Sequence, residues 1–114
     1  MPFKLSRCIC LATDQHDRAI SFYRDLIGLE TIQEKAGSVE FKAEPYRFYV
    51  DHADAHGGGH GMVFELIVPD LETARKELTE AGCEVIRWEG KGRDCYVRDP
   101  FGAIFNLWED PDAF

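Results

Sequence analysis

The chain has 114 residues, of which 45% are hydrophobic and 30% are charged, and its formal net charge is −8 at pH 7. This length and composition predict a single globular domain with its own core and no segment long enough to cross a membrane. Because phosphate recognition needs a basic surface, the acidic balance argues against nucleic-acid and anionic-membrane partners. The first residues lack the apolar core of a signal peptide, so we expect a cytoplasmic protein.

The first half of the chain predicts the order strand, helix, strand, strand, strand. Apolar residues alternate with polar ones in the predicted strands and recur at helical spacing between Asp14, a predicted N-cap, and Ile27. Gly28 follows as the expected end of that helix. The predicted strands cover residues 5–12, 29–35, 38–43 and 46–51.

The second half repeats this order. A predicted helix begins at Asp70 after Pro69 and ends before Gly82, and the predicted strands cover residues 62–68, 83–89, 94–98 and 103–109. We therefore expect one domain over 1–114, made of a module at 1–52, a glycine-rich linker at 53–61 and a module at 62–114. The predicted class is α+β.

A turn is predicted at Asp99-Pro100-Phe101-Gly102, because proline presets φ, aspartate bonds its own backbone and glycine accepts positive φ. In the strand that follows, Ala103, Phe105 and Leu107 form an apolar face. Ile104, Asn106 and Trp108 form a mixed face.

Four predicted strands share such a mixed face opposite an apolar one. A concave surface with aromatic walls and a few polar groups is the usual form of a small-molecule site. We therefore predict a ligand-binding surface built from Cys8, Cys10, Arg47, Tyr49, Asp51, Glu65, Asn106 and Trp108.

Several of these residues also have a purely structural interpretation. Cys8 and Cys10 fit a strand as small residues, and all four cysteines of the chain are expected to be reduced, since no C-x-x-C pair is present. Glu65 needs a partner in an apolar strand, so Arg47 forms either an ion pair with it or a ligand contact. Asn106 either satisfies a buried group or orients a ligand.

Three histidines, His52 at the end of the first module and His56 and His60 in the linker, are spaced four residues apart. On a helix this spacing would bring them to one face as metal ligands. The three glycines at 57–59 disfavour a helix there, so a solvated loop is the preferred interpretation.

The chain resembles the vicinal oxygen chelate superfamily, also called the glyoxalase/bleomycin resistance protein/dioxygenase family. The resemblance rests on residues 19–29 (AISFYRDLIGL), residues 68–72 (VPDLE) and Asp99-Pro100-Phe101-Gly102 before a strand. It implies two βαβββ modules that form a curved mixed β-sheet around a U-shaped pocket, with the helices on the outer face. It also implies a homodimer.

Enzymes of this family hold a divalent metal with His, Gln or Glu side chains, and the resemblance places three of those positions on Cys8, Val63 and Asn106. Valine cannot bind a metal and asparagine is a poor ligand for a transition metal. No cofactor is therefore predicted. A shifted site built from Cys10, Asp51 and Glu65 remains the metal-binding alternative.

The preferred function is a metal-free protein that binds or sequesters a small molecule, as antibiotic-resistance proteins of this family do, with a cationic or aromatic ligand. The alternative is a metal-dependent lyase, isomerase or dioxygenase with non-standard ligands. A third alternative is an interaction module that uses the fold without a ligand.

Overall fold

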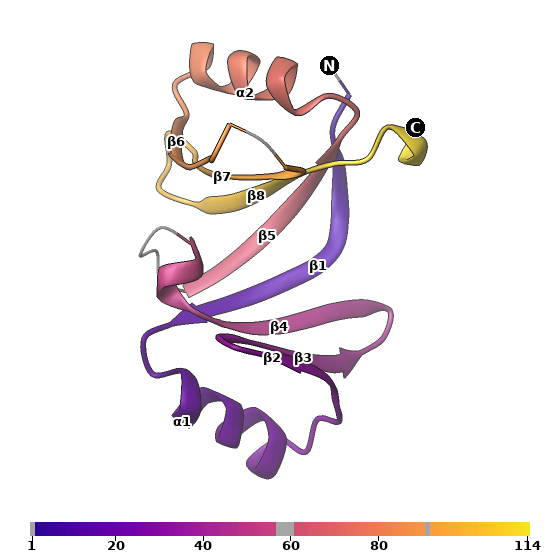
Figure 1. Cartoon of the computed structure of the whole chain (residues 1–114), viewed down its shortest axis with the longest axis vertical. Coiled ribbons are helices and arrows are strands. Elements are labelled where there is room, and N and C mark those ends of the chain that lie inside the picture. Colours follow the sequence, from indigo (N-terminus) through magenta and orange to yellow (C-terminus); the bar gives the residue numbers. More distant parts are fainter. Residues whose placement is uncertain (1, 57–60, 91) are drawn as a thin grey trace. The chain divides into compact units, whose positions relative to one another are not determined.

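The computed structural model describes residues 2–56, 61–90 and 92–114. This part of the chain has a mixed α+β architecture with eight strands and two α-helices, in the order expected for two βαβββ modules (Figure 1). The predicted fold class is therefore confirmed at this level. The chain divides into two compact units. The first unit spans residues 7–63, and the second unit spans residues 64–114 together with the N-terminal segment up to Ser6.

The first unit is a four-stranded sheet with a helix on one face (Figure 1). Its strand order is β2-β3-β4-β1, with β1 and β4 parallel and the other pairs antiparallel. Its elements are β1 (Lys4–Thr13), α1 (His16–Ser21), the π-helix η1 (Phe22–Leu26), β2 (Thr31–Lys35), β3 (Ser38–Ala43), β4 (Tyr46–His52) and the 3-10 helix η2 (Ala53–His56).

The core of the first unit lies between the sheet and α1. It contains alternate residues of β3 and β4, because successive side chains of a strand point to opposite faces. The Tyr23 ring meets the Phe48 ring edge-on, with centroids 5.1 Å apart. The buried members are Val39, Phe41, Phe48 and Val50, and Ile9, Leu11, Ala19, Ile20, Tyr23, Leu29 and Ala43 pack against them.

The second unit repeats the plan with strand order β5-β8-β7-β6 and α2 against its sheet (Figure 1). Its core comprises the buried residues Val68, Leu71, Ala74, Cys95, Val97, Phe105 and Leu107. Its elements are β5 (Gly61–Val68), α2 (Leu71–Glu80), β6 (Glu84–Arg87), β7 (Asp94–Arg98), β8 (Ile104–Glu109) and the 3-10 helix η3 (Pro111–Ala113).

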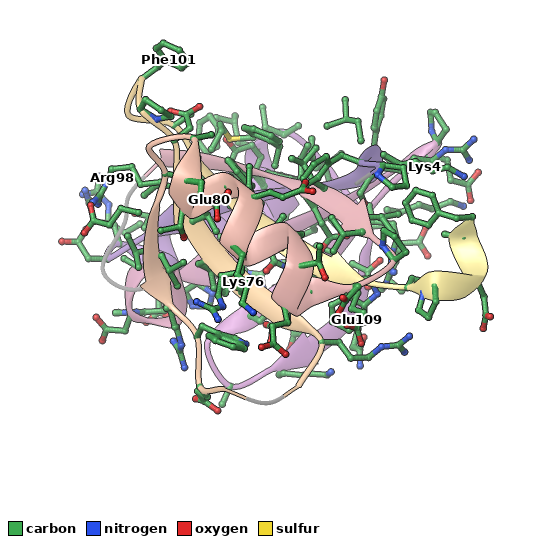
Figure 2. The ribbon with its side chains drawn as sticks, turned by 90° about the horizontal axis from the view of Figure 1, so that it is seen from above. Lys4, Lys76, Glu80, Arg98, Phe101 and Glu109 are labelled. Carbon is green, nitrogen blue, oxygen red and sulfur yellow. The ribbon has the colours of Figure 1, made fainter. Side chains whose placement is uncertain are left out.

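Two side-chain contacts stabilise the second unit, one at the start of α2 and one between its N-terminal and C-terminal segments. The Glu109 carboxylate accepts a hydrogen bond from the Leu71 N–H at the start of α2, at 2.9 Å. A carboxylate at this place also complements the positive end of the helix dipole. Lys4 donates from Nζ to the Ala113 carbonyl and lies 4.6 Å from the centre of the Phe114 ring. Figure 2 labels Lys4 and Glu109 at these places.

The turn between β7 and β8 has the predicted chemistry. Asp99 Oδ1 accepts from the backbone N–H groups of Phe101 and Ala103, at 2.8 and 2.9 Å, and Gly102 adopts a φ of 96°. Phe101 stands at the tip of this turn with 92% of its surface exposed (Figure 2).

The first helix differs from its prediction at both ends. We expected an N-cap at Asp14 and one α-helix to Ile27, but α1 begins at His16. The Thr13 hydroxyl accepts from the Gln15 N–H at 3.1 Å and so occupies the turn before the helix. From Phe22 the winding widens to a π-helix, in which the Ile27 N–H bonds to the Phe22 carbonyl. Gly28, with a φ of 86°, ends the element as predicted.

Other boundaries moved by a few residues. β2 begins at Thr31 rather than 29, and β8 begins at Ile104 rather than 103. β6 covers only Glu84–Arg87 rather than 83–89, and its pairing with β7 shifts register between Val85 and Arg87. Residues 53–56 of the predicted linker form η2, and residues 57–60 lie outside the described part. In the described ranges no helix is both long and apolar enough to span a bilayer.

Candidate functional site

The polar face of the first unit is the sheet face opposite its core. In the register of β1 and β4, Cys8 lies beside Arg47 and Cys10 lies beside Tyr49, while Asp51 continues the same face two residues further along β4. The structure thus brings together the five predicted site residues of this unit. The alternation along the strands is sufficient to place them, because paired residues in neighbouring strands share a face.

A buried carboxylate, Glu40 of β3, joins this polar face. Its register partner is Tyr49 and it is only 7% exposed. Arg47 donates from Nε to Glu40 Oε2 at 3.2 Å and from Nη2 to Glu40 Oε1 at 3.3 Å. This two-point geometry holds the guanidinium in a fixed plane. The hydrogen bonds to Glu40 also raise the pKa of Arg47 above its usual value, so the guanidinium stays charged.

Tyr49 lies beneath the guanidinium, with the Arg47 Cζ 5.4 Å from its ring centre. Burial raises the pKa of Tyr49 to about 12, with the Arg47 charge opposing the shift. The phenol therefore remains protonated at neutral pH and keeps its hydrogen-bond donor.

The polar face of the second unit is built on β5 and β8. Glu65 lies beside Asn106 in the strand register, and Ile67 lies beside Trp108. Asn106 is only 8% exposed and uses both ends of its amide. Its Nδ2 donates to Glu65 Oε2 at 3.0 Å, and its Oδ1 accepts from the Cys95 N–H at 3.2 Å. Asn106 therefore links β5, β7 and β8.

Trp108, the third predicted residue on this face, is half-buried. The Arg93 guanidinium lies over its ring, with Cζ 5.4 Å from the ring centre. Arg93 is itself held by donation from Nε to the Glu109 carbonyl at 3.0 Å. The ring is thus already used once as a cation-binding surface.

The charged partners differ from one alternative left open by the sequence. The sequence leaves Arg47 open as the ion-pair partner of Glu65. In the structure Arg47 pairs with Glu40, and the Glu65 carboxylate is bonded by the Asn106 amide. Glu40 was missed because its strand alternates like a half-exposed one. Glu40 could have been found from the β3–β4 register, which places Lys42 opposite Arg47 and therefore brings Glu40, two residues away on the same face, within reach of that arginine.

Two of the three positions implied as metal ligands do not fit a transition metal. Val63 has no donor atom and is buried. The Asn106 oxygen already accepts from a backbone N–H, and its nitrogen points to a carboxylate. In the alternative set, burial and the Asp51 carboxylate raise the pKa of the Cys10 thiol in the protein without metal.

The linker histidines are described only in part. His52 ends β4, and its Nδ1 accepts from the Asp54 N–H at 3.2 Å. Its ring centre lies 6.3 Å from that of His16. The side chain of His56 and the whole of His60 lie outside the described residues.

Thiol reactivity provides the first testable consequence of this geometry. Burial raises the pKa of Cys95 to about 11, and burial also raises the pKa of Cys10, so few thiolates form at these positions at pH 8. Cys8 and Cys83 are partly exposed. We expect iodoacetamide at pH 8 to label Cys10 and Cys95 at least about tenfold more slowly than unfolded protein, measured by peptide mass spectrometry.

Because the pKa values of these thiols are raised, the rate of labelling should increase at higher pH than for an ordinary cysteine. Labelling of Cys95 should continue to rise above pH 9, where an ordinary thiol is already largely ionised, because its folded-state pKa is higher. Protein in urea is the control, in which all four cysteines should react alike. Rapid labelling of Cys95 in the native state would contradict the buried position found here.

Comparison with known proteins agrees with this architecture. The family model of the glyoxalase-like domain matches residues 8–108. The chain therefore belongs to the glyoxalase-like domain family, within the superfamily of glyoxalases, bleomycin resistance proteins and dioxygenases. A comparison with curated proteins gives no match.

Solved structures share the fold at low identity. A glyoxalase/bleomycin resistance protein/dioxygenase superfamily member from Vibrio splendidus 12B01 is 18% identical, with a TM-score of 0.62 over 96% of this chain and 100% of its own. The NAD-dependent benzaldehyde dehydrogenase from Legionella pneumophila is 13% identical, with a TM-score of 0.66 over 94% of this chain and 97% of its own.

A third structure carries a metal. The Mn(II)-bound glyoxalase from Novosphingobium aromaticivorans is 23% identical, with a TM-score of 0.60 over 96% of this chain and 40% of its own. These similarities show a common fold. The two activities named among the three proteins, a benzaldehyde dehydrogenase and a glyoxalase, differ, so the function has to be argued from the site.

Proposed function

We propose that this protein binds or sequesters a small molecule without the help of a metal, as resistance proteins of its superfamily do. The observation that carries the proposal is the state of Asn106. Its amide closes a hydrogen-bond network with Glu65 and the Cys95 backbone, at the position where the family enzymes place a metal ligand. A buried amide with both ends bonded is a stable structural element rather than a vacant ligand.

The side chains of each polar face, taken by itself, suit recognition of a flat molecule. In the first unit Tyr49 supplies an aromatic surface and Asp51 a carboxylate for a positive group on the ligand; in the second unit Trp108 and Glu65 supply the same pair of groups. Asn106 orients the Glu65 carboxylate. The net charge of −8 favours a ligand that is cationic as a whole or in part.

Metal-dependent lyase, isomerase or dioxygenase chemistry is the second candidate, supported by the similarity in fold to the Mn(II)-bound glyoxalase. In that case a divalent metal would polarise adjacent oxygens of the substrate. The two candidates differ in the metal content of the native protein.

The first experiment measures metal. Tag-free protein is purified without chelator, loaded separately with nickel, zinc, manganese and iron, desalted and analysed by mass spectrometry. We expect no stoichiometric metal. We also expect no rise in melting temperature on loading, since only a metal bound to the folded state would raise it. One equivalent of retained metal with a higher melting temperature, reversed by chelator, would favour the enzyme instead.

The second experiment tests the aromatic site. The chain has two tryptophans, and Trp88 packs under Arg75 at 4.1 Å on the other side of the sheet. Trp88→Phe therefore leaves Trp108 as the reporter for a fluorescence screen of cationic aromatic compounds. Because Trp108→Ala removes this reporter, its affinity and that of Trp88→Phe are compared by titration calorimetry. We expect Trp108→Ala to weaken a compound found in the screen about tenfold or more while the protein stays folded by circular dichroism. Equal affinity in both variants would exclude Trp108 from the site.

A further inference from the structure

The ion pair of Arg47 and Glu40 is markedly asymmetric in its exposure. The Glu40 side chain is 8% exposed, whereas the Arg47 side chain is 59% exposed. Burying a carboxylate in a sheet costs folding free energy unless it is hydrogen-bonded, and Arg47 supplies the hydrogen bonds to Glu40. The result is a buried negative group beneath a cation that faces outward.

The geometry of the pair leaves part of the guanidinium available. Arginine has five N–H donors in a rigid fork. Glu40 takes one from Nε and one from Nη2. Of the other three, one N–H on Nη1 and one on Nη2 form the end edge of the fork, which has the spacing to bind a carboxylate or phosphate with two parallel hydrogen bonds.

The surroundings fix this edge in place. Tyr49 supports one side of the guanidinium, with the Arg47 Cζ 5.4 Å from its ring centre, and Cys8 is the register neighbour of Arg47 on β1. A side chain anchored at two atoms and supported by a ring has lost most of its conformational freedom before a ligand arrives. Binding a ligand then costs less entropy.

We propose that Arg47, positioned by Glu40, binds an anionic group, a carboxylate or a phosphate, on an aromatic ligand whose ring packs beside Tyr49. This inference rests on the proposed binding function and adds an acidic group to the ligand expected there. Arg47 acts as the specificity-determining residue. Glu40 is a positioning residue that also competes with the ligand for the guanidinium.

The test uses probes that share a ring and differ in charge: benzoate and phenyl phosphate as anions, benzamide as the neutral compound and benzamidine as the cation. Each is titrated into 15N-labelled full-length protein, and the Arg47 Nε–H signal, identified by its loss in Arg47→Met, is followed by NMR. We expect the anions to shift that signal saturably, and the neutral and cationic probes to leave it unchanged. A response to only one anion would distinguish carboxylate from phosphate.

Variants test the two roles separately. Arg47→Met should weaken the anions at least about tenfold, because a charge-assisted two-point contact is lost. Glu40→Gln should strengthen them about two- to fivefold, since the competing carboxylate charge is removed while one acceptor for the arginine remains. The matched control is Arg98→Met, which breaks an exposed cross-strand pair with Glu84 and should change neither affinity.

Folding is controlled with the double variant Glu40→Gln/Arg47→Met, which removes both charges and so leaves no unpaired buried carboxylate. It should melt near the wild type and still bind the anions weakly. Anion binding that is insensitive to Arg47, or no anion response at its Nε–H, would overturn the inference. If benzamidine or benzamide nevertheless binds at Trp108, the proposed function stands without it. Stoichiometric retained metal would instead remove the proposed function itself.

Discussion

Replacing Asn106 with aspartate is expected to destabilise the protein by about 2–4 kcal/mol at pH 8, because it puts a second carboxylate where the amide now donates to Glu65 and removes that hydrogen bond. The new side chain can still accept from the Cys95 N–H, so the loss falls on the contact with Glu65. Urea denaturation at several pH values measures the effect.

The pH dependence of this variant has a definite sign. Two carboxylates in contact cannot both ionise cheaply, so one of them has a folded-state pKa above its unfolded value of about 4. The folded variant then binds more protons than the unfolded chain, and its stability falls as pH rises from that unfolded pKa through the raised one. We therefore expect Asn106→Asp to approach wild-type stability near pH 4 and to be weakest above pH 7.

The matched control reverses the polarity of the pair. In Glu65→Gln/Asn106→Asp the glutamine amide can donate to the new carboxylate, so the double variant should regain most of the lost stability at pH 8. A non-additive result of this kind isolates the interaction between the two residues. If Asn106→Asp is as stable as wild type at pH 8, the hydrogen bond to Glu65 does not contribute as described.

The second large effect is expected in the core of the second unit. Leu107 is completely buried in β8 between the sheet and α2. Leu107→Ala removes three heavy atoms from a packed site and leaves a cavity, with an expected cost of about 3 kcal/mol. The change in urea midpoint at a constant slope measures this loss.

Leu5 serves as the control for that substitution. It belongs to the same unit but is 72% exposed, and Leu5→Ala should change stability by less than about 0.5 kcal/mol. Equal losses of stability in the two variants would mean that the effect comes from strand propensity rather than from burial. Leu107 would then not belong to the packed core.

The faces of the sheet strands were predictable because alternation is a local property. The polar spacing of Arg47, Tyr49 and Asp51 is enough to put them on one face, and β1 then supplies Cys8 and Cys10 by register. In the same way Asn106 and Trp108 share a face of β8 opposite the core residues Phe105 and Leu107.

Partners across strands were not predictable from spacing alone. The bond between Glu40 and Arg47 depends on which residues of β3 and β4 lie side by side, and Glu40 in isolation has the pattern of a solvent-facing residue. In the same way, Asn106 could be identified as the partner of Glu65 only from the register of β5 and β8. A charged residue predicted to be buried must have a partner, but only the strand register identifies which residue that partner is.

Helix ends were the least predictable local feature. Asp14 has the residue type of an N-cap, yet the Thr13 hydroxyl binds the Gln15 N–H first and the helix begins at His16. The widened turn of η1 has no composition signal, because Phe22–Leu26 would suit an α-helix equally well.

The contact of Lys4 with Ala113 and Phe114 has a practical use. It holds the first and last described segments of the second unit within one side-chain length of each other. Donor and acceptor dyes attached near these two positions would therefore start close together and separate when the unit opens. Resonance energy transfer between them would follow unfolding of each variant directly, without relying on the tryptophans that report on ligand.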